Sequence, residues 1–375
     1  MFEKREAVSV IIPVWNPGPG IDRCIASLRR QTLKEIEMIF VDDCGTDDAM
    51  AKVRLAARED PRIRIIENPE NLGAGPSQNR GIEAARGIYF SFVDPDDYIA
   101  DDFLERLYET ASSSRADIAK GRCVYLQANG AAVQRPRELI DIIRQRLAAG
   151  WTLFAVFTYE HWSAIYHSRL FEDGTVRYGI TRHDQDTLFL LRACLKTENV
   201  VLCGEALYFF VERGDSAMHR LPEDGWDDMA AAFEAQVESL LRLNAENAYA
   251  CVYTAGRLEN MIKRCRAFQD DPLLKNGYRD FKERIRRTVL PLPFVDSLRG
   301  RYFSVEVFLD HGVCLPNDVY ALPWNKKPLL PYFRLAADHL RFAFRHPRYF
   351  GICIRRIFSL SKKAAKAAAQ RLIPS

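Results

Sequence analysis

The stretch IYFSFVDPDD, residues 88–97, decides the fold of this chain. Its first six residues, Ser91 apart, are apolar, aromatic or β-branched, as expected of a buried strand, and its last four include three carboxylates. Runs of the same kind precede it at 8–12, 36–41 and 63–66, the first of them expected to end at Pro13. Segments with helical periodicity separate these runs, so strand and helix alternate. This alternation predicts a parallel sheet with right-handed crossovers.

Candidate ligand-binding residues follow each of the expected strands. They are Pro13 to Asn16, Asp42 and Asp43, Asn68 to Gly75, and Asp94, Asp96 and Asp97. Parallel sheets bind ligands beyond the carboxyl ends of their strands, so we expect these residues to share one site. Clustered carboxylates repel one another unless a cation joins them, and Mg²⁺ or Mn²⁺ bridging a diphosphate fits such a cluster. The alternatives are ordinary helix caps for the aspartates and core packing for Trp15.

Six short motifs in this order resemble the donor-binding half of family 2 glycosyltransferases of the GT-A fold. The match covers roughly the first 125 residues, and the motifs are Pro13-Val14-Trp15-Asn16, Gln31-Thr32, Val41-Asp42-Asp43, Asn71-x-Gly73, Asn79-x-Gly81 and Asp94-x-Asp96-Asp97. The resemblance implies an α/β domain with a Rossmann-like, mostly parallel central sheet flanked by helices. It also implies an inverting hexosyltransferase that uses a nucleotide-sugar donor and a divalent metal, Mn²⁺ or Mg²⁺.

The resemblance assigns expected roles to individual residues. Trp15 is expected to stack on the nucleobase, Asp42 and Asp43 to contact the base or ribose, and Asp96 and Asp94 to hold the metal, with Asp94 also near the ribose. Pro13, Asn16 and Gln78 complete the expected donor site, and Asp97 is read as a cap of the following helix. Two departures affect the nucleotide contacts: Cys44-Gly45-Thr46-Asp47 replaces the family's Gly-Ser-Thr-Asp, and Ser77-Gln78-Asn79 replaces its Ala-Arg-Asn.

The middle of the chain supplies the expected acceptor side. His161 to Tyr166 resembles the family's acceptor-side element, and Asp186 begins a helical pattern, where the helix dipole keeps a carboxylate ionised. By alignment with the family's Glu-Asp, Asp186 of Gln185-Asp186 is the expected catalytic base, Asp184 the fallback, and a helix cap the alternative. After the last expected strand, Arg213 and Ser216 are expected near the donor phosphates, and His219 is a further candidate metal ligand.

Charge is distributed unevenly along the 375 residues. Residues 326–375 contain twelve Lys or Arg and one acidic residue, Asp338, a local charge of +11 that leaves −8 of the net +3 to residues 1–325. The tail's apolar and basic side chains fall on different sides of an expected helix, which favours binding to anionic lipid. The alternative is a helix that docks on the acidic body or mediates oligomer contacts. No module that reads nucleic acid is recognisable, so no nucleic-acid partner is expected.

We expect a glycosyltransferase domain over 1–220, with a nucleotide-sugar half at 1–125 and an acceptor half at 126–220. A helical domain at 221–325 and the basic amphipathic tail at 326–375 are expected to follow it. Nine scattered cysteines and the lack of a long apolar run indicate a cytoplasmic protein, held at the inner face of the plasma membrane by its tail.

The expected reaction is sugar transfer, from a UDP-sugar by preference, to a glycan or lipid-linked glycan in the synthesis of a bacterial cell-surface polysaccharide. Two alternatives stay open. One is an inactive scaffold of the same fold, which Gln185 in place of Glu favours. The other is a nucleotidyltransferase. An enzyme of that class needs a Gly-rich loop with Arg and Lys after the first strand, and the segment Asn16 to Gly20 has neither basic residue.

Overall fold

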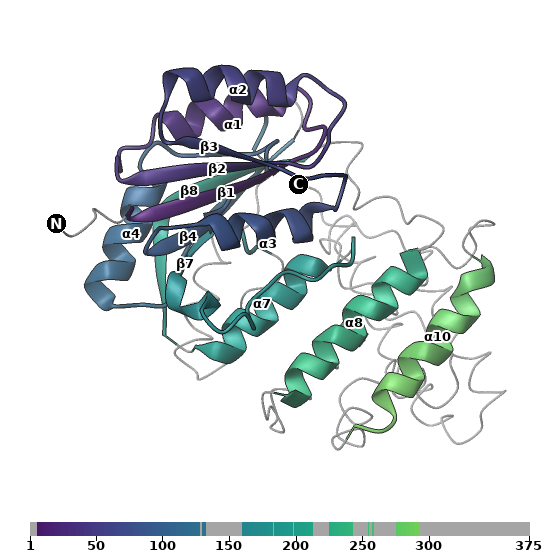
Figure 1. The fold of residues 1–375 in the computed structure, drawn as a ribbon. Coiled ribbons are helices and arrows are strands. Elements are labelled where there is room, and N and C mark those ends of the chain that lie inside the picture. Colours follow the sequence, from purple (N-terminus) through teal and green to yellow (C-terminus); the bar gives the residue numbers. More distant parts are fainter. Residues whose placement is uncertain are drawn as a thin grey trace, which may run out of the picture. The chain divides into compact units, whose positions relative to one another are not determined.

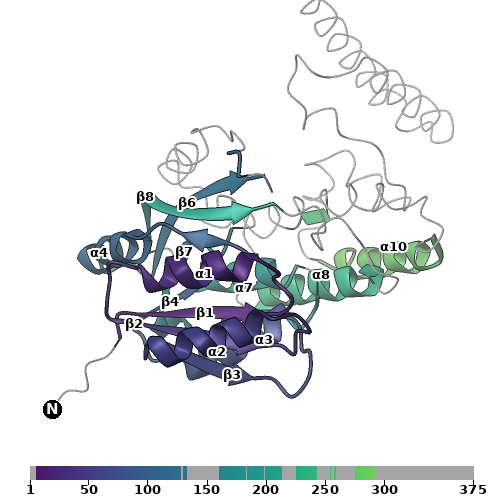
Figure 2. The same cartoon turned by 90° about the horizontal axis from the view of Figure 1, so that it is seen from above.

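The computed structural model describes residues 6–127, 130–132, 160–182, 184–197, 199–212, 225–242, 254, 257–258 and 275–292. The chain divides into two compact units, residues 1–245 and 246–375. Within the described part of the first unit, eight strands form one sheet in the order β3-β2-β1-β4-β7-β6-β8-β5 (Figure 1). Figure 2 shows the same order from above, with β3, β2 and β1 at one side and β6 and β8 at the other.

The first half of the sheet is parallel, as the sequence predicts. Its strands are β1 (Val8–Val14), β2 (Ile36–Asp42), β3 (Ile63–Glu67) and β4 (Tyr89–Phe92), and its crossover helices are α1 (Gly20–Arg29), α2 (Ala49–Glu59) and α3 (Ala74–Ala84). β1 lies between β2 and β4 and pairs with both in parallel. The alternation of strand and helix therefore predicted the topology of this half correctly.

The expected end of the first strand at Pro13 is wrong. β1 continues through Pro13, which is paired with Val41 of β2, to Val14. Its pairing with β4 reaches only Ile11, opposite Phe92. The missing proline N–H therefore falls beyond the paired part of that neighbour, where it interrupts little of the ladder.

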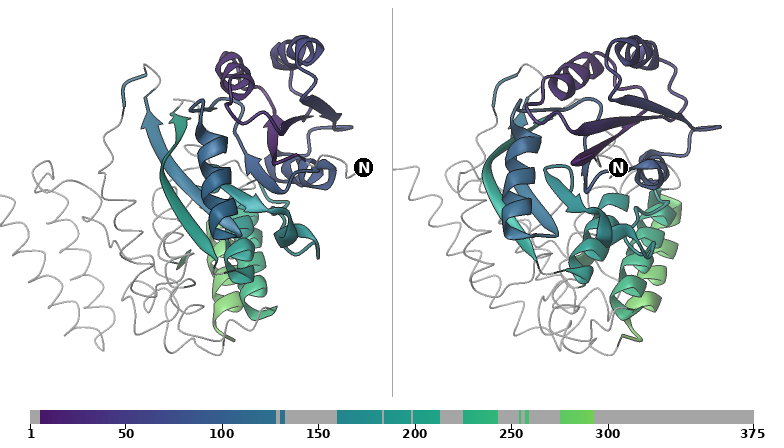
Figure 3. Two further views of the ribbon diagram at one scale, coloured as in Figure 1. Left: turned by 90° about the vertical axis from the view of Figure 1, so that its left-hand side faces the viewer. Right: turned by 60° about the vertical axis from the view of Figure 1, so that its left-hand side comes forward.

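The second half of the sheet mixes parallel and antiparallel pairs. Its elements are β5 (Tyr98–Ile99), α4 (Phe103–Ser114), β6 (Ile118–Leu126), β7 (Ala164–His167), the 3₁₀ helix η1 (Ser168–Phe171), α7 (Gln185–Lys196) and β8 (Val200–Val211). β7 runs antiparallel to β4 and β6, whereas β6 and β8 run parallel, side by side, as the two long strands seen in Figure 3. The result is the mostly parallel mixed sheet that was predicted.

Helices cover both faces of this sheet. On one face, alternate residues of β1 such as Val8, Val10 and Ile12 share an apolar core with buried side chains of α1, α2 and α4. On the other face α3 lies so close to β1 that a Cβ at Gly81 would sit 2.3 Å from the Ile11 side chain. α7 joins this second face through Phe189, whose ring packs on Phe92 of β4. Each face is thus buried, which suits the near-continuous apolar character of the parallel strands.

Two helices follow the sheet. α8 (Gly225–Arg242) belongs to the first unit and contacts α7, where Arg192 Nε donates to Ser239 Oγ at 3.2 Å. α10 (Lys275–Val289) belongs to the second unit. No helix among the described ranges is both long enough and apolar enough to cross a bilayer. Much of the helical domain expected at 221–325 lies outside the described residues, and the basic tail lies wholly outside them. The domain boundaries drawn from the sequence stay predictions.

Candidate functional site

The parallel register brings the ends of three strands together. Val14, Asp42 and Glu67, the last residues of β1, β2 and β3, are register partners across the sheet, and β4 ends at Phe92 beside β1. The loops that follow these strands therefore leave from one edge of the sheet. This edge, with the loops after β1, β2, β3 and β4, is called the strand-end edge below.

Asn16 ties together the loops after β1 and β2. Its side-chain Oδ1 accepts hydrogen bonds from the backbone N–H groups of Thr46 at 2.6 Å and Asp47 at 3.2 Å, and its own φ is +47°. Gly18 N in turn donates to Asp47 Oδ2 at 2.9 Å. Asn16 was expected to bind the donor. Its hydrogen bonds show that it holds the loops after β1 and β2 together at the strand-end edge.

The paired aspartates after β2 have different surroundings. Asp42 accepts from Arg54 Nη2 and from Cys44 N, each at 3.1 Å. Asp43 is buried, with 2% of its surface exposed, and both of its oxygens accept hydrogen bonds. The donors are Asn68 Nδ2 at 2.7 Å, Leu72 N at 2.8 Å and Gly73 N at 2.9 Å. Asp43 therefore fixes the loop after β3, and Gly73 supplies the left-handed turn there, with φ +89°.

Trp15 and Gln78 differ sharply in exposure. Trp15 follows β1 at the strand-end edge with 55% of its surface exposed, so core packing, the alternative reading of this residue, is wrong. An exposed indole at this place is available for stacking. Gln78 of α3 is 3% exposed, and its Oε1 is buried without a hydrogen-bond partner among the residues that the structure describes. Pro13 is buried within β1.

The turn after β4 gathers carboxylates. Burial, and then the charges of Asp96 and Asp186, raise the pKa of Asp94 from 3.8 to about 7. Asp94 and Asp96 come from this turn and Asp186 from α7, so the acceptor half contributes to the same electrostatic cluster as the donor half. Among the described residues, no group of three His, Cys, Asp or Glu is arranged to hold a metal ion by protein ligands alone.

Asp97 does not cap the helix that follows, contrary to the sequence reading. Its Oδ2 accepts from Tyr208 Oη at 2.9 Å and its Oδ1 from Val211 N at 2.8 Å, both on β8. Tyr208 Oη also accepts from Asp94 N at 3.1 Å. The residue that precedes α4 is instead Asp102. The hydrogen bonds of Asp97 connect the turn at residues 94–97, called the carboxylate turn below, to the sheet. Asp97 is buried there, and burial raises its pKa well above the usual value.

Asp186 lies in the first turn of α7, as expected. Its Oδ1 accepts from Thr187 N at 2.8 Å, and the positive end of the helix dipole favours its ionised form. Asp184, the fallback base, occupies the N-cap position with φ +58° but makes no side-chain capping bond. Arg213, Ser216 and His219 lie outside the described residues, so their expected roles stay predictions.

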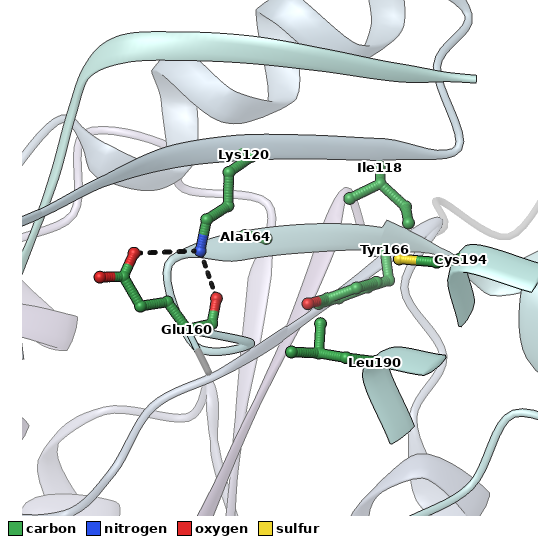
Figure 4. Close-up of a pocket in the computed structure, with 7 residues that line it drawn as sticks. All are labelled: Ile118, Lys120, Glu160, Ala164, Tyr166, Leu190 and Cys194. Atoms are coloured by element: carbon green, nitrogen blue, oxygen red, sulfur yellow. Dashed lines mark hydrogen bonds and ion pairs between the residues drawn. The ribbon is translucent and has the colours of Figure 1, made fainter. Parts of the chain in front are cut away.

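A buried ion pair supports the acceptor half and was missed from the sequence. Lys120 of β6 lies 3.6 Å from the Glu160 carboxylate and donates to the Glu160 carbonyl and to Ser163 Oγ, as Figure 4 shows for its contacts with Glu160. Tyr125 donates to the other Glu160 oxygen. Burial lowers the pKa of Lys120. A single lysine in an apolar strand gives no signal of its partner 40 residues away, so only the fold reveals this pair.

The sequence of this chain is similar to sequences of known glycosyltransferases. The profile of "Glycosyl transferase family 2" matches residues 9–175. The uncharacterized glycosyltransferase EpsJ of Bacillus subtilis is 35% identical over 219 residues, which are 56% of this chain and 62% of EpsJ. The succinoglycan biosynthesis protein ExoO of Rhizobium meliloti is 30% identical over 241 residues, 62% of this chain and 69% of ExoO.

A solved structure has the same fold. S. aureus TarS 1-349, crystallised in complex with UDP-GlcNAc, superposes with a TM-score of 0.59 at 22% identity, covering 84% of this chain and 95% of that one. The likeness confirms the predicted GT-A fold. The match to EpsJ, by contrast, spans less than two thirds of that relative's length.

Proposed function

The chain belongs to glycosyl transferase family 2, and we propose that it transfers a sugar from a nucleotide-diphosphate sugar to a saccharide acceptor. The observation that supports this most is that Asp96 of the donor half and Asp186 of the acceptor half both add, after burial, to the raised pKa of Asp94. Asp94 and Asp96 lie in the turn after a strand of the donor half, and Asp186 lies in the first turn of a helix of the acceptor half. Such an arrangement suits a site where a donor diphosphate and an acceptor hydroxyl meet.

The donor is proposed to bind along the strand-end edge. The exposed indole of Trp15 stacks on the base, and Asp42 accepts from base or ribose. Asp43 and Asn16 act chiefly by shaping the loops around the nucleotide, since their oxygens already accept backbone N–H groups. Gln78 offers a buried amide oxygen that has no partner in the described part of the chain, beside Ser77, whose hydroxyl accepts from the Asn68 amide. The TarS neighbour was crystallised with UDP-GlcNAc, which supports a UDP-sugar here.

The carboxylate turn fits a divalent cation. The charge of Asp96 destabilises the ionised form of Asp94, a cost that a cation removes. Mg²⁺ and Mn²⁺ are commonly held by one or two carboxylates plus substrate phosphates, so a third protein ligand is not required. We assign Asp96 and Asp94 as the ligands of Mn²⁺ or Mg²⁺. When bound, the cation supplies positive charge that stabilises the departing nucleotide diphosphate.

Asp186 is proposed as the general base. It takes the proton from the acceptor hydroxyl, whose oxygen attacks the anomeric carbon while the bond to the diphosphate breaks. Direct displacement inverts the configuration at that carbon and needs no covalent enzyme intermediate. Its place in the first turn of α7 puts the Asp186 carboxylate at the positive end of the helix dipole, which favours the ionised form that a base requires. Asp184 is the alternative base.

The acceptor is proposed to be a glycan, lipid-linked by preference, in the synthesis of a surface polysaccharide. The relative ExoO is named for succinoglycan biosynthesis, which supports a polysaccharide product. Twelve basic residues in 326–375 suit binding to the anionic inner face of a plasma membrane. Flotation of the full chain with anionic vesicles tests this, with neutral vesicles as the control. Flotation that survives deletion of 326–375 contradicts the membrane role.

A donor screen tests the proposed activity. Thermal shifts are measured with UDP-, GDP- and dTDP-sugars in the presence of Mn²⁺, and sugar release is then followed for the donor with the largest shift. We expect Asp96→Ala to abolish both the Mn²⁺-dependent shift and sugar release, whereas Asp101→Ala, at an exposed surface site, leaves both intact. A full shift without release in the wild type would favour the inactive scaffold, the alternative that Gln185 suggested.

A further inference from the structure

The motif Asn79-x-Gly81 has no part in the site described so far, yet Asn79 bridges the two halves of the domain. Its Nδ2 donates to the Tyr178 carbonyl at 3.1 Å, and its Oδ1 accepts from the Tyr178 N–H at 2.9 Å. A side-chain amide thus pairs with both backbone groups of one residue, as a neighbouring strand would. The pairing joins α3 of the donor half to a loop 99 residues further along the chain.

A second contact docks the same loop on α3. A Cβ at Gly75 would lie 2.3 Å from the Gly179 carbonyl oxygen and 3.1 Å from the Gln185 side chain. Gly179 N also donates to the Gln185 carbonyl at 3.4 Å. Only glycine allows this approach, since any side chain at position 75 would push the loop away. Gln185 is the first residue of α7, so the contact reaches the helix that holds Asp186.

The Tyr178 ring completes the connection. It stacks on Phe189 of α7, with ring centroids 4.2 Å apart and planes 4° apart, and meets Phe92 of β4 edge-on at 5.2 Å. Phe92 precedes the carboxylate turn and Phe189 follows Asp186 by three residues. The charges of Asp94 and Asp186 both contribute to raising the Tyr178 pKa, after burial and Tyr166. The Tyr178 ring thus contacts an aromatic residue near the carboxylates of each half, Phe92 before the turn after β4 and Phe189 after Asp186.

We propose that Asn79 is a positioning residue that sets the place of Asp186 relative to the donor-side aspartates, acting through the Tyr178 backbone and helix α7. The proposal rests on the role of Asp186 given above. Asn79 touches no substrate in it; the two bonds hold Tyr178, whose ring holds Phe189. Positioning errors of about 1 Å can lower turnover by roughly 100-fold without changing the chemistry of the base.

The test uses the full chain with Asn79→Ala and Gly75→Ala, which disturb the same contact from its two sides. Asn199→Ala is the matched control, because its amide also bonds a backbone carbonyl, that of Arg115, and does so at the opposite ends of the strands. Nucleotide affinity is measured with UDP and GDP in the presence of Mn²⁺. Turnover is measured as hydrolysis of the donor that the thermal screen selects. Amide hydrogen exchange is followed at residues 184–190.

We expect both variants to lower kcat by roughly 10- to 100-fold, to speed exchange in the first turn of α7, and to leave nucleotide affinity within about twofold. Asn199→Ala should change none of the three. Turnover of Asn79→Ala within twofold of wild type, or unchanged exchange at 184–190, overturns the proposal. A parallel loss of affinity and turnover also overturns it, because that pattern indicates a merely structural role. If Asp186→Asn has the turnover of the wild type, the proposed base is wrong. The amide hydrogen exchange at residues 184–190 then still tests, independently of the base, whether Asn79 holds the start of α7 in place.

Discussion

The raised pKa of Asp94 makes the stability of the cation-free protein depend on pH. In the unfolded chain this carboxyl ionises near its usual pKa of 3.8, whereas in the folded chain it keeps its proton up to about pH 7. The folded state therefore binds one more proton between about pH 4 and pH 7. Stability falls as pH rises through that window, and the loss is complete above pH 7. Asp94→Asn removes this dependence, because an amide does not titrate.

The magnitude follows from the two pKa values. A difference of about three pKa units corresponds to about 4 kcal/mol of unfolding free energy. Asp94 is only partly shielded from solvent, which weakens its repulsion with Asp96 and Asp186, so we expect about 2 kcal/mol. From pH 5 to pH 8, the unfolding free energy of the wild type should therefore fall by about 2 kcal/mol more than that of Asp94→Asn.

Urea unfolding in EDTA at pH 5 and pH 8 measures the effect. The quantity of interest is the change in unfolding free energy between the two pH values, compared between wild type and Asp94→Asn. Asp101→Asn serves as the control, because that carboxylate is 55% exposed and paired with Arg30. Adding Mn²⁺ at pH 8 should restore stability to the wild type but not to Asp94→Asn. Identical pH dependence in wild type and Asp94→Asn would refute the convergence of carboxylates on Asp94.

Three further substitutions test individual contacts. Asp43→Ala removes the acceptor of three hydrogen bonds and should lower the free energy of unfolding in urea by about 3 kcal/mol. It should also weaken nucleotide binding in calorimetry. Unchanged nucleotide affinity would show that the loop after β3 is not part of the donor site. Lys120→Met leaves the buried Glu160 carboxylate without its cation and should lower the free energy of unfolding by about 3 kcal/mol. Adding Glu160→Gln to this variant should recover part of that loss. If the effects of the two substitutions are simply additive, the ion pair is not supported. Tyr208→Phe removes the hydrogen bonds to Asp97 and from the Asp94 N–H, and should weaken Mn²⁺ binding about tenfold in calorimetry. Tyr89→Phe loses one bond to a carbonyl elsewhere and should not weaken it. Equal Mn²⁺ affinities in the two variants would show that Tyr208 does not support the proposed metal ligands.

Local pattern was enough to predict the donor half. β-branched runs separated by amphipathic helices predict a parallel sheet. The rule that parallel strand ends meet at one edge correctly placed Trp15, Asp42 and Asp94 at the same edge. The helical periodicity of the residues that follow it likewise placed Asp186 at the start of a helix. These predictions rest on residues close in sequence, or on a topology with few alternatives.

Contacts between distant segments were beyond sequence reasoning. Asp97 was read as a cap because the next helix is near in sequence, but its partners are 111 and 114 residues away on β8. The two-residue strand β5 has no periodicity to detect and exists only because β8 lies beside it. The partners of Asn79 and Lys120 were hidden for the same reason, since a polar side chain in an apolar or helical segment does not indicate what it meets.

The central claim is that Asp186 acts as the base opposite a donor held at the strand-end edge. Asp186→Asn tests it most directly, by calorimetric titration with the nucleotide and Mn²⁺ alongside the rate of sugar release from the donor. We predict unchanged nucleotide affinity and a rate lowered by at least about 100-fold. Equal rates in wild type and Asp186→Asn, at equal nucleotide affinity, would contradict the account.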